Sequence, residues 1–465
     1  MKARTNKITR KGVSILDNIK LKISPPFGGY FFSLFVILFV VCFLLYIEKD
    51  FWALLLFVFA SLFVLMLSTT DKIVFDGQSI SRTGIFPKIW AYINGQKTKI
   101  NLDSINQVET SILLTLKKTK KVSYIYKTVV RGFESSLVFA SSVNDNYRAF
   151  MKALISRVNK EALDFSSLEI SRYTTQKEKV LAEAKTLKLF LDDSSEDLKL
   201  DLLLLKNRSK NADDFETSLN SDEIIAKRQR LHKLANELKV LGYLPQSLEA
   251  FRRALALKPK DAWLYFEYSR CLQLFAESER NERFARKAKA YLRLSRIHGK
   301  GDAEILTYIA EAYLQYSDLN KAQETFRMAL KRKEENYRAL LGLAEIALRE
   351  GKIARVIHYL MKAQTVAKTN ALREWTSKEI AYFAKLNSDL SYVEKEMSRV
   401  DWLEKIHFGK KFTIWVFLTG FPLIVLGTFY EQSLGTIGWT LSTLSLLGWM
   451  GLNASASFLT QRTPL

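Results

Sequence analysis

Apolar residues gather in two pairs of long runs, one pair near each end of the chain. Residues 27–47 and 51–68 form the first pair, and residues 412–430 and 434–452 form the second. Each run has about the length that a helix needs to cross a bilayer, roughly 17–25 residues. The turns inside the pairs are so short that each pair must form an antiparallel hairpin. The pattern therefore predicts four spans in two transmembrane hairpins, at 27–68 and 412–452.

The charges beside these runs predict their orientation. Residues 1–26 carry seven lysines and arginines against one acid, Asp17, and three lysines within 405–411 precede the second pair. Lysine and arginine accumulate on the cytoplasmic side of membrane proteins. We therefore expect a bacterial inner-membrane protein whose two termini (1–26 and 453–465) and soluble domains are cytoplasmic. None of the four runs contains Asp, Glu, Lys, Arg or His, which argues against a transporter or channel.

The last apolar run also contains small residues at helical spacing, namely Gly435, Gly438, Ser442 and Ser445. Small residues on one stripe let two helices approach closely. Two interpretations stay open: a binding face for another membrane protein, and packing within the hairpin itself.

Between residues 73 and 142 the apolar period changes to that of strands. Asp76-Gly77 and Asn94-Gly95 predict hairpin turns, because both turn positions require positive φ. Strand-like runs follow at residues 111–116, 122–130 and 135–141. The period then becomes helical, with an apolar face made of Tyr147, Phe150, Met151, Leu154, Ile155 and Val158.

This order of strands and one C-terminal amphipathic helix resembles a pleckstrin-homology (PH)-like barrel, and a membrane hairpin leading into it resembles the bacterial membrane PH-like families. The resemblance covers residues 28–160 and implies a PH-like β-barrel at 70–162 that is capped by its helix. Four lysines crowd one turn of this domain: Lys117, Lys118, Lys120 and Lys121. The resemblance implies that this turn touches anionic lipid headgroups, and a solvated turn is the alternative.

Residues 163–225 form a charged segment without proline. Thr175 and Glu178 match a capping box, which predicts a helix to about Leu191. A second helix is predicted from Ser194 to about Asn207, followed by a polar loop at 207–222. We therefore expect a helical linker.

A repeat with a period of about 34 residues begins at Arg228. In its first unit, 228–261, the signature positions are Leu231, Leu234, Ala235, Leu238, Gly242, Ser247, Phe251, Ala254 and Pro259. The chain here resembles the tetratricopeptide repeat (TPR) family, with further units at 262–302, 303–336 and 337–370. The second unit carries about seven extra residues, and insertions in solenoids usually map to loops. The resemblance implies a TPR α-solenoid at 228–386 that includes a capping helix, and a helix at 387–411 is expected to connect it to the third span.

The TPR resemblance also implies a concave face that binds partners. First-helix positions of the four units face it, and they hold His232, Asn236, Arg270, Glu311 and Glu345. The two glutamates depart from the cationic pattern of family members that capture C-terminal carboxylates. Solvated surface is the alternative interpretation of these positions.

The densest basic stripe of the chain lies in the second unit. Arg283, Arg286, Lys287 and Arg293 are the candidate contact residues, and Arg280, Lys289 and Arg296 lie among them. An acidic protein or anionic lipid would match this stripe. Aromatic residues are sparse here, so we expect no nucleic-acid partner.

Taken together, these patterns predict a multidomain α-helical membrane protein with a β-rich domain. The net charge of +22 fits the cytoplasmic bias of basic residues. No phosphate loop, nucleophile elbow or metal-ligand spacing occurs, so we expect no enzyme and no cofactor. The functional hypothesis is a membrane-anchored cytoplasmic scaffold or assembly factor that docks protein partners through its repeats, within a larger membrane complex. A regulator that senses anionic lipid through the PH-like domain is the alternative.

Overall fold

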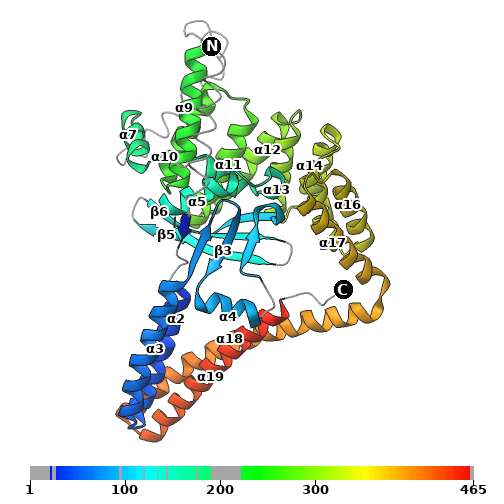
Figure 1. Ribbon diagram of the computed structural model, residues 1–465. Coiled ribbons are helices and arrows are strands. Elements are labelled where there is room, and N and C mark those ends of the chain that lie inside the picture. Colours follow the sequence, from blue (N-terminus) through cyan, green and yellow to red (C-terminus); the bar gives the residue numbers. More distant parts are fainter. Residues whose placement is uncertain are drawn as a thin grey trace, which may run out of the picture. The chain divides into compact units, whose positions relative to one another are not determined.

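A computed structural model of the protein describes residues 21–23, 28–93, 97–118, 121–132, 135–142, 145–173, 176–189 and 221–460. The chain divides into two compact units. The first consists of Met1–Ile23, Phe75–Ile80 and Ile100–Ser377, and the second of Ser24–Val74, Ser81–Lys99 and Lys378–Leu465. Figure 1 labels their helices and strands.

The strands of the described residues form two sheets. One has the order β1-β2-β3-β4, with β1 (Leu21–Ile23), β2 (Lys72–Phe75), β3 (Ser79–Thr83) and β4 (Lys99–Asn101). The other is antiparallel, with the order β5 (Gln107–Lys118), β6 (Lys121–Arg131) and β7 (Ser136–Ser142). The three strands predicted at 111–116, 122–130 and 135–141 are thereby confirmed.

The expected barrel is not observed. Strands β1 and β4 are three residues each, and among the described strands the two sheets remain separate. Closing a barrel requires continuous pairing around the sheet, which such short strands do not supply. The likeness to the PH-like families therefore stays a prediction.

The two predicted hairpin turns had different outcomes. At Asp76-Gly77 the turn is confirmed, since Gly77 has φ 91° and the Asp76 Oδ1 atom accepts the Gln78 amide at 3.0 Å. Asn94-Gly95 lies outside the described residues, and the segment before it is helix α4 (Ile85–Ile93) rather than a strand. Ile85, Ile89 and Tyr92 recur at helical spacing, and this period prevails over the strand propensity of the individual residues.

Helix α5 (Asp145–Ile155) packs its apolar face inside the first unit. Phe150 lies 5.8 Å from Phe75 and 5.5 Å from Phe139 between ring centroids, and all three rings are buried. The predicted helical face is confirmed. It is followed by the short η2 turn (Lys160–Ala162), α6 (Phe165–Arg172) and α7 (Lys177–Thr186).

The predicted linker is confirmed in part. Helix α7 begins after Gln176 and ends at Thr186, before the expected Leu191. Thr175, the second predicted helix and most of the predicted loop at 207–222 lie outside the described residues.

The first unit continues as a solenoid of antiparallel helix pairs (Figure 1). The pairs are α9 (Ser221–Val240) with α10 (Leu244–Leu257), α11 (Ala262–Glu279) with α12 (Glu282–His298), α13 (Ala303–Gln315) with α14 (Leu319–Arg332), and α15 (Tyr337–Arg349) with α16 (Ile353–Val366). Helix α17 (Asn370–Ser388) follows them. The predicted helical repeat, with its four units and a further helix, is confirmed.

Small residues allow close packing within each pair. Ala254 and Ala329 are fully buried, and the Ser247 hydroxyl donates to the Ala235 carbonyl at 2.7 Å between α10 and α9. In the second pair, the Ser269 hydroxyl donates to the Ala288 carbonyl at 2.7 Å. The extra residues of this pair lengthen its helices to 18 and 17 residues, so the expectation of a loop insertion is wrong.

The second unit contains two helical hairpins, α2 (Gly28–Tyr46) with α3 (Asp50–Thr70), and α18 (Leu390–Phe429) with α19 (Gln432–Leu459). As predicted, the connecting helix and the third apolar run form one helix, α18. Asp389 precedes it with extended backbone and caps it through the Ser391 and Tyr392 amides. This break separates α18 from α17, so the helix does not run without interruption from the solenoid.

Among the described residues, two helices are long and apolar enough to cross a membrane, Asp50–Thr70 and Leu390–Gly427. The apolar helix Tyr30–Tyr46 is shorter, spanning about 26 Å at 1.5 Å per residue against a hydrocarbon core of roughly 30 Å. Helix α19 does not qualify, because glycine, serine and threonine recur among its leucines. The prediction of four spans is therefore corrected to two candidate spans.

Gly438 and Ser442 of the small-residue stripe pack within the α18–α19 hairpin, while a Cβ atom at Gly435 would lie 2.7 Å from the Tyr46 hydroxyl of α2. A Cβ atom at Gly438 would lie 2.6 Å from the Ile424 amide nitrogen of α18, and one at Gly420 would lie 2.1 Å from the Ser442 hydroxyl. Of the two interpretations left open by the sequence, the contacts favour internal packing.

Candidate docking surfaces of the helical repeat

The first helices of the repeat pairs contact a segment of the same chain, residues 159–173, which we call the inner segment. Its Phe165 ring lies 5.0 Å from the Phe266 ring of α11 and 4.9 Å from the Tyr308 ring of α13, in edge-to-face contacts. The Arg270 guanidinium lies 4.5 Å from the centroid of the Phe165 ring. The inner segment thus buries an aromatic side chain between two consecutive repeats.

Local chemistry forms the helix of the inner segment. Asp164 is the N-cap of α6, and its Oδ1 atom accepts the Ser167 amide at 2.9 Å and the Thr110 amide of β5 at 3.3 Å. The Asp164 amide in turn donates to the Val108 carbonyl at 3.1 Å. Removal from water raises the pKa of the Asp164 carboxyl to about 6, although the hydrogen bonds from Ser167 and the charge of Arg338 oppose this.

Ion pairs also attach the inner segment to the solenoid. Glu169 pairs with Lys239 of α9 and lies 3.6 Å from Arg270, and both Glu169 and Lys239 are buried. Arg338 of α15 donates to the Leu163 carbonyl and to Glu311 at 2.9 and 2.7 Å. All four repeats therefore contribute to this contact.

The five predicted concave-face residues all have partners within the chain. His232 and Asn236 contact the carboxylate of Glu267, the latter at 2.7 Å. Glu345 pairs with Arg349 at 2.6 Å. Arg270 contacts Phe165 and Glu169 of the inner segment, and Glu311 pairs with Arg338. Burial disfavours ionisation of Glu267, but His232, Lys239 and Asn236 together outweigh it through hydrogen bonds and charge, so the pKa of Glu267 is lowered.

The turn with the predicted lipid-facing lysines joins β5 to β6, and its backbone register pairs Lys118 with Lys121 and Lys117 with Val122. Lys120 lies outside the described residues. Beside this turn the Val122 amide donates to the Gly242 carbonyl of the α9–α10 turn at 3.0 Å. The structure thus connects this β-hairpin to the first repeat through the backbone.

The basic stripe lies on α12. Arg283, Arg286 and Lys287 are exposed, and none of them forms an ion pair with another described residue. Arg296 differs, since it pairs with Glu324 of α14 at 2.6 Å. Arg293 is likewise exposed and forms no ion pair with a described residue, so all four predicted contact residues present uncompensated charge.

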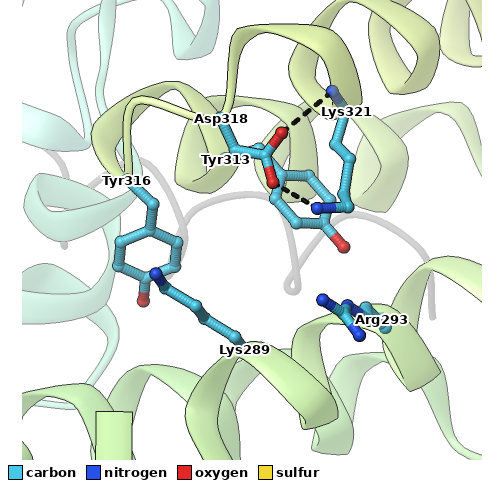
Figure 2. A pocket seen from close by; sticks show the side chains of 6 residues that line it. All are labelled: Lys289, Arg293, Tyr313, Tyr316, Asp318 and Lys321. Carbon is cyan, nitrogen blue, oxygen red and sulfur yellow. Dashed lines mark hydrogen bonds and ion pairs between the residues drawn. The ribbon is translucent and has the colours of Figure 1, made fainter. Parts of the chain in front are cut away.

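The fourth, Arg293, lines a separate cavity of about 200 Å³ with Lys289, Tyr313, Tyr316, Asp318 and Lys321. Figure 2 shows these side chains converging from α12, α13 and the start of α14. Asp318 pairs with Lys321, and this ammonium group lowers the pKa of the Asp318 carboxyl. Burial raises the pKa of Tyr316 to about 12.

Sequence reasoning did not find this cavity. Lys289 belongs to the basic stripe, and Tyr313 lies in the third predicted unit, 303–336. Tyr316, Asp318 and Lys321 lie in and after the α13–α14 turn. The sequence feature that could have indicated the cavity is two tyrosines and a lysine around one turn, next to a basic helix.

No group of three or more His, Cys, Asp or Glu residues suited to a metal ion occurs within the described ranges. Cys42 and Cys271 are free thiols.

Comparisons with known proteins give a limited result. No protein-family model matches the chain, and no curated protein matches it. A solved structure described as "Functional Characterization of Pseudomonas Aeruginosa pilF" is similar at 15% identity and a TM-score of 0.30, covering 50% of this chain and 99% of that one.

Proposed function

We propose that this protein is a membrane-anchored scaffold that docks a protein partner through its helical repeat, with its repeat and β-rich domains in the cytoplasm. The uncompensated basic surface of α12 supports this proposal most strongly. Arg283, Arg286 and Lys287 form this surface, which we call the basic surface. A protein partner with a matching acidic surface would be attracted to it electrostatically.

Exposed apolar side chains support membrane anchoring. Only 17% of the apolar window of α3 and 6% of that of α18 is buried. Exposed apolar surface of this extent is typical of membrane or protein contact. Helix α4 adds Ile85, Ile89 and Tyr92, which are all exposed at helical spacing.

The inner segment supports docking on α12 rather than on the first-helix face. A partner at Arg270 or Glu311 would have to replace buried ring contacts and charge-assisted hydrogen bonds within the chain. A partner at Arg283 or Arg286 replaces only water. We therefore favour α12 as the docking surface, and the predicted concave residues are the second site to test.

Recognition of anionic lipid by the β5–β6 turn is the second candidate function. The pairing of Lys118 with Lys121 supports it, because such pairing gathers several positive charges at one hairpin tip. Each base near an anionic membrane surface contributes about 1 kcal/mol. Changing Lys117, Lys118, Lys120 and Lys121 to glutamine should then reduce binding of the purified full-length protein, in neutral detergent, to anionic lipid but not to neutral lipid.

Topology provides a direct test of the anchoring. In a background with Cys42 and Cys271 replaced by alanine, single cysteines are introduced at Lys49, Ser433 and the exposed Lys260. An impermeant thiol reagent on intact cells should label the first two and spare the third until the membrane is opened. Extraction of the protein by alkaline carbonate, or labelling at 260 but not at 49, would contradict the proposal.

A further inference from the structure

The cavity between α12 and the α13–α14 turn has an excess of positive charge. The cavity is lined by three cations, Lys289, Arg293 and Lys321, and by one carboxylate, Asp318. Its net charge is therefore +2. Asp318 is already paired with Lys321. Lys289 and Arg293 form no ion pair with any described residue, so their charges remain available to a ligand.

A buried donor at the same place independently indicates a ligand. Tyr313 is 3% exposed, and its hydroxyl is buried without a hydrogen-bond partner among the described residues. Figure 2 shows this hydroxyl on the side of the ring that faces Arg293. A buried polar group without a partner costs about 1–3 kcal/mol, and an anionic oxygen would remove this cost by accepting the hydrogen bond.

The chemistry of the donors selects the class of anion. A guanidinium, two ammonium groups and a hydroxyl together supply many donors, and only the hydroxyl among them can also accept. A phosphate group offers several strong acceptor oxygens and a charge of about −1.5 to −2 at neutral pH, which matches the net charge of two. A carboxylate would neutralise only half of it.

The size of the cavity limits what else it holds. Pockets for drug-sized ligands measure roughly 300–1,000 Å³, and this cavity has about 200 Å³. It is therefore suited to a phosphate with a small substituent rather than to a whole nucleotide.

We propose that Lys289, Arg293, Lys321 and Tyr313 form a binding site for the phosphate group of a small phosphorylated ligand. The tyrosine hydroxyl and the Arg293 guanidinium donate to phosphate oxygens, while Lys289 and Lys321 balance the charge. The ligand is either a soluble phosphate monoester or a phospholipid headgroup that is itself a phosphate monoester, as in phosphatidic acid. The site does not depend on a protein partner at the basic surface.

The test uses the full-length protein in a neutral detergent and follows its thermal unfolding as inorganic phosphate is added. Sodium chloride at the same ionic strength is the reference, because specific binding stabilises saturably while screening does not. We expect a saturable stabilisation by phosphate. Tyr313→Phe, Arg293→Gln and Lys289→Gln should each weaken the apparent affinity by about tenfold or more.

Arg286→Gln is the matched control, because it removes an exposed base from the same helix but outside the cavity. Tyr313→Phe is the most informative variant. It should leave the phosphate-free protein at least as stable as the wild type, since the lost hydroxyl has no partner and the cost of burying it is removed, and still weaken phosphate binding.

A second arm identifies the source of the phosphate. Glycerol 3-phosphate is compared with nanodiscs of phosphatidylcholine that contain or lack phosphatidic acid. If the protein binds glycerol 3-phosphate and the three variants lose this binding, the ligand is a soluble ester. If the protein binds only nanodiscs with phosphatidic acid and the three variants lose that binding, the ligand is a lipid headgroup. Equal effects of phosphate and chloride without lipid binding, or wild-type affinity in all three variants, would overturn the proposal.

Discussion

The guanidinium of Arg270 stacks over the ring of Phe165, 4.5 Å from its centroid, although 105 positions separate the two residues. Phe165 also contacts Phe266 and Tyr308, so one side chain connects the inner segment to two repeats. Contacts of this kind contribute through burial of the ring and through the cation–π interaction, about 0.5–2 kcal/mol for the latter.

Phe165→Ala should destabilise the contact between the inner segment and the solenoid by about 3–5 kcal/mol, the usual range for a buried phenylalanine. Hydrogen exchange in the full-length protein should show faster exchange of the α6 amides. Phe284→Ala, which removes a ring from α12 remote from this contact, is the control and should leave α6 unchanged. Unaltered α6 exchange in Phe165→Ala would contradict the proposed contact.

Gly242 is expected to be essential at the turn between α9 and α10. It has φ +84°, and a Cβ atom there would lie 1.7 Å from the Val122 carbonyl oxygen. Gly351 is a matched control, because it also has positive φ, +72°, but has open space around it. Gly351→Ala should cost about 1–2 kcal/mol from backbone strain. Gly242→Ala should lower the thermal midpoint clearly further, and equal losses in the two variants would show that the close approach of Val122 is absent.

Ala254→Glu should unfold the repeat, because it places an unpaired charge between packed helices at a cost of several kcal/mol. The neighbouring Ala256 is exposed, so Ala256→Glu is the control and should have little effect. Limited proteolysis of the full-length protein in detergent provides the measurement. Equal resistance of the two variants would disprove the assignment of Ala254 to the helix contact.

Asp164 should make the inner segment sensitive to pH. Its folded pKa of about 6 exceeds the unfolded value of about 3.9, so the folded state binds a proton more tightly. Its contribution to stability is therefore most favourable below pH 4, decreases as the pH rises from about 4 to 6, and is constant above that. Asp164→Asn keeps an oxygen at the N-cap but does not titrate. Relative to the wild type, the free energy of unfolding of this variant should rise by on the order of 2–3 kcal/mol between pH 4 and pH 6. Thermal unfolding provides the measurement. A stability difference between the two proteins that stays constant from pH 4 to pH 7 would refute the raised pKa.

The repeat could be predicted from sequence because its signal is local and periodic. Small residues such as Ala254 and Ala329 are required wherever paired helices touch, so their spacing reveals the helix pairs. Strands β5–β7 and the apolar face of α5 were predicted for the same reason, since alternation and helical period indicate which residues face inward.

The inner segment could not be predicted in this way. Phe165 and Phe266 are distant in the chain, and no local pattern shows which apolar face covers which. The first-helix residues were therefore expected to await a partner, although Arg270 contacts the chain's own Phe165 and Glu169. Helix α4 was missed because its isoleucines and aromatic residues favour strands individually, while only the spacing of Ile85, Ile89 and Tyr92 favours a helix.

The cavity between α12 and the α13–α14 turn could not be predicted from the sequence either. Arg293 was selected for its place in a dense basic stripe, but the stripe divides between two surfaces. Arg283, Arg286 and Lys287 are exposed. Lys289 and Arg293 are exposed as well, but they also line the cavity with Tyr313 and Lys321 from the next pair of helices. Only the packing of α12 against α13 and α14 brings these groups together.

Site-specific photo-cross-linking in intact cells tests the docking proposal most directly. A photoreactive residue replaces Arg286 on the basic surface in one full-length variant and Glu345 on the first-helix face in another. We predict that position 286 forms adducts with a second protein. These adducts should be lost when Arg283 and Lys287 are both changed to glutamate. They should be retained when Lys331 and Lys333 are changed to glutamate instead. Adducts from position 345 alone, or adducts from 286 that persist after the charge reversal, would contradict docking on α12.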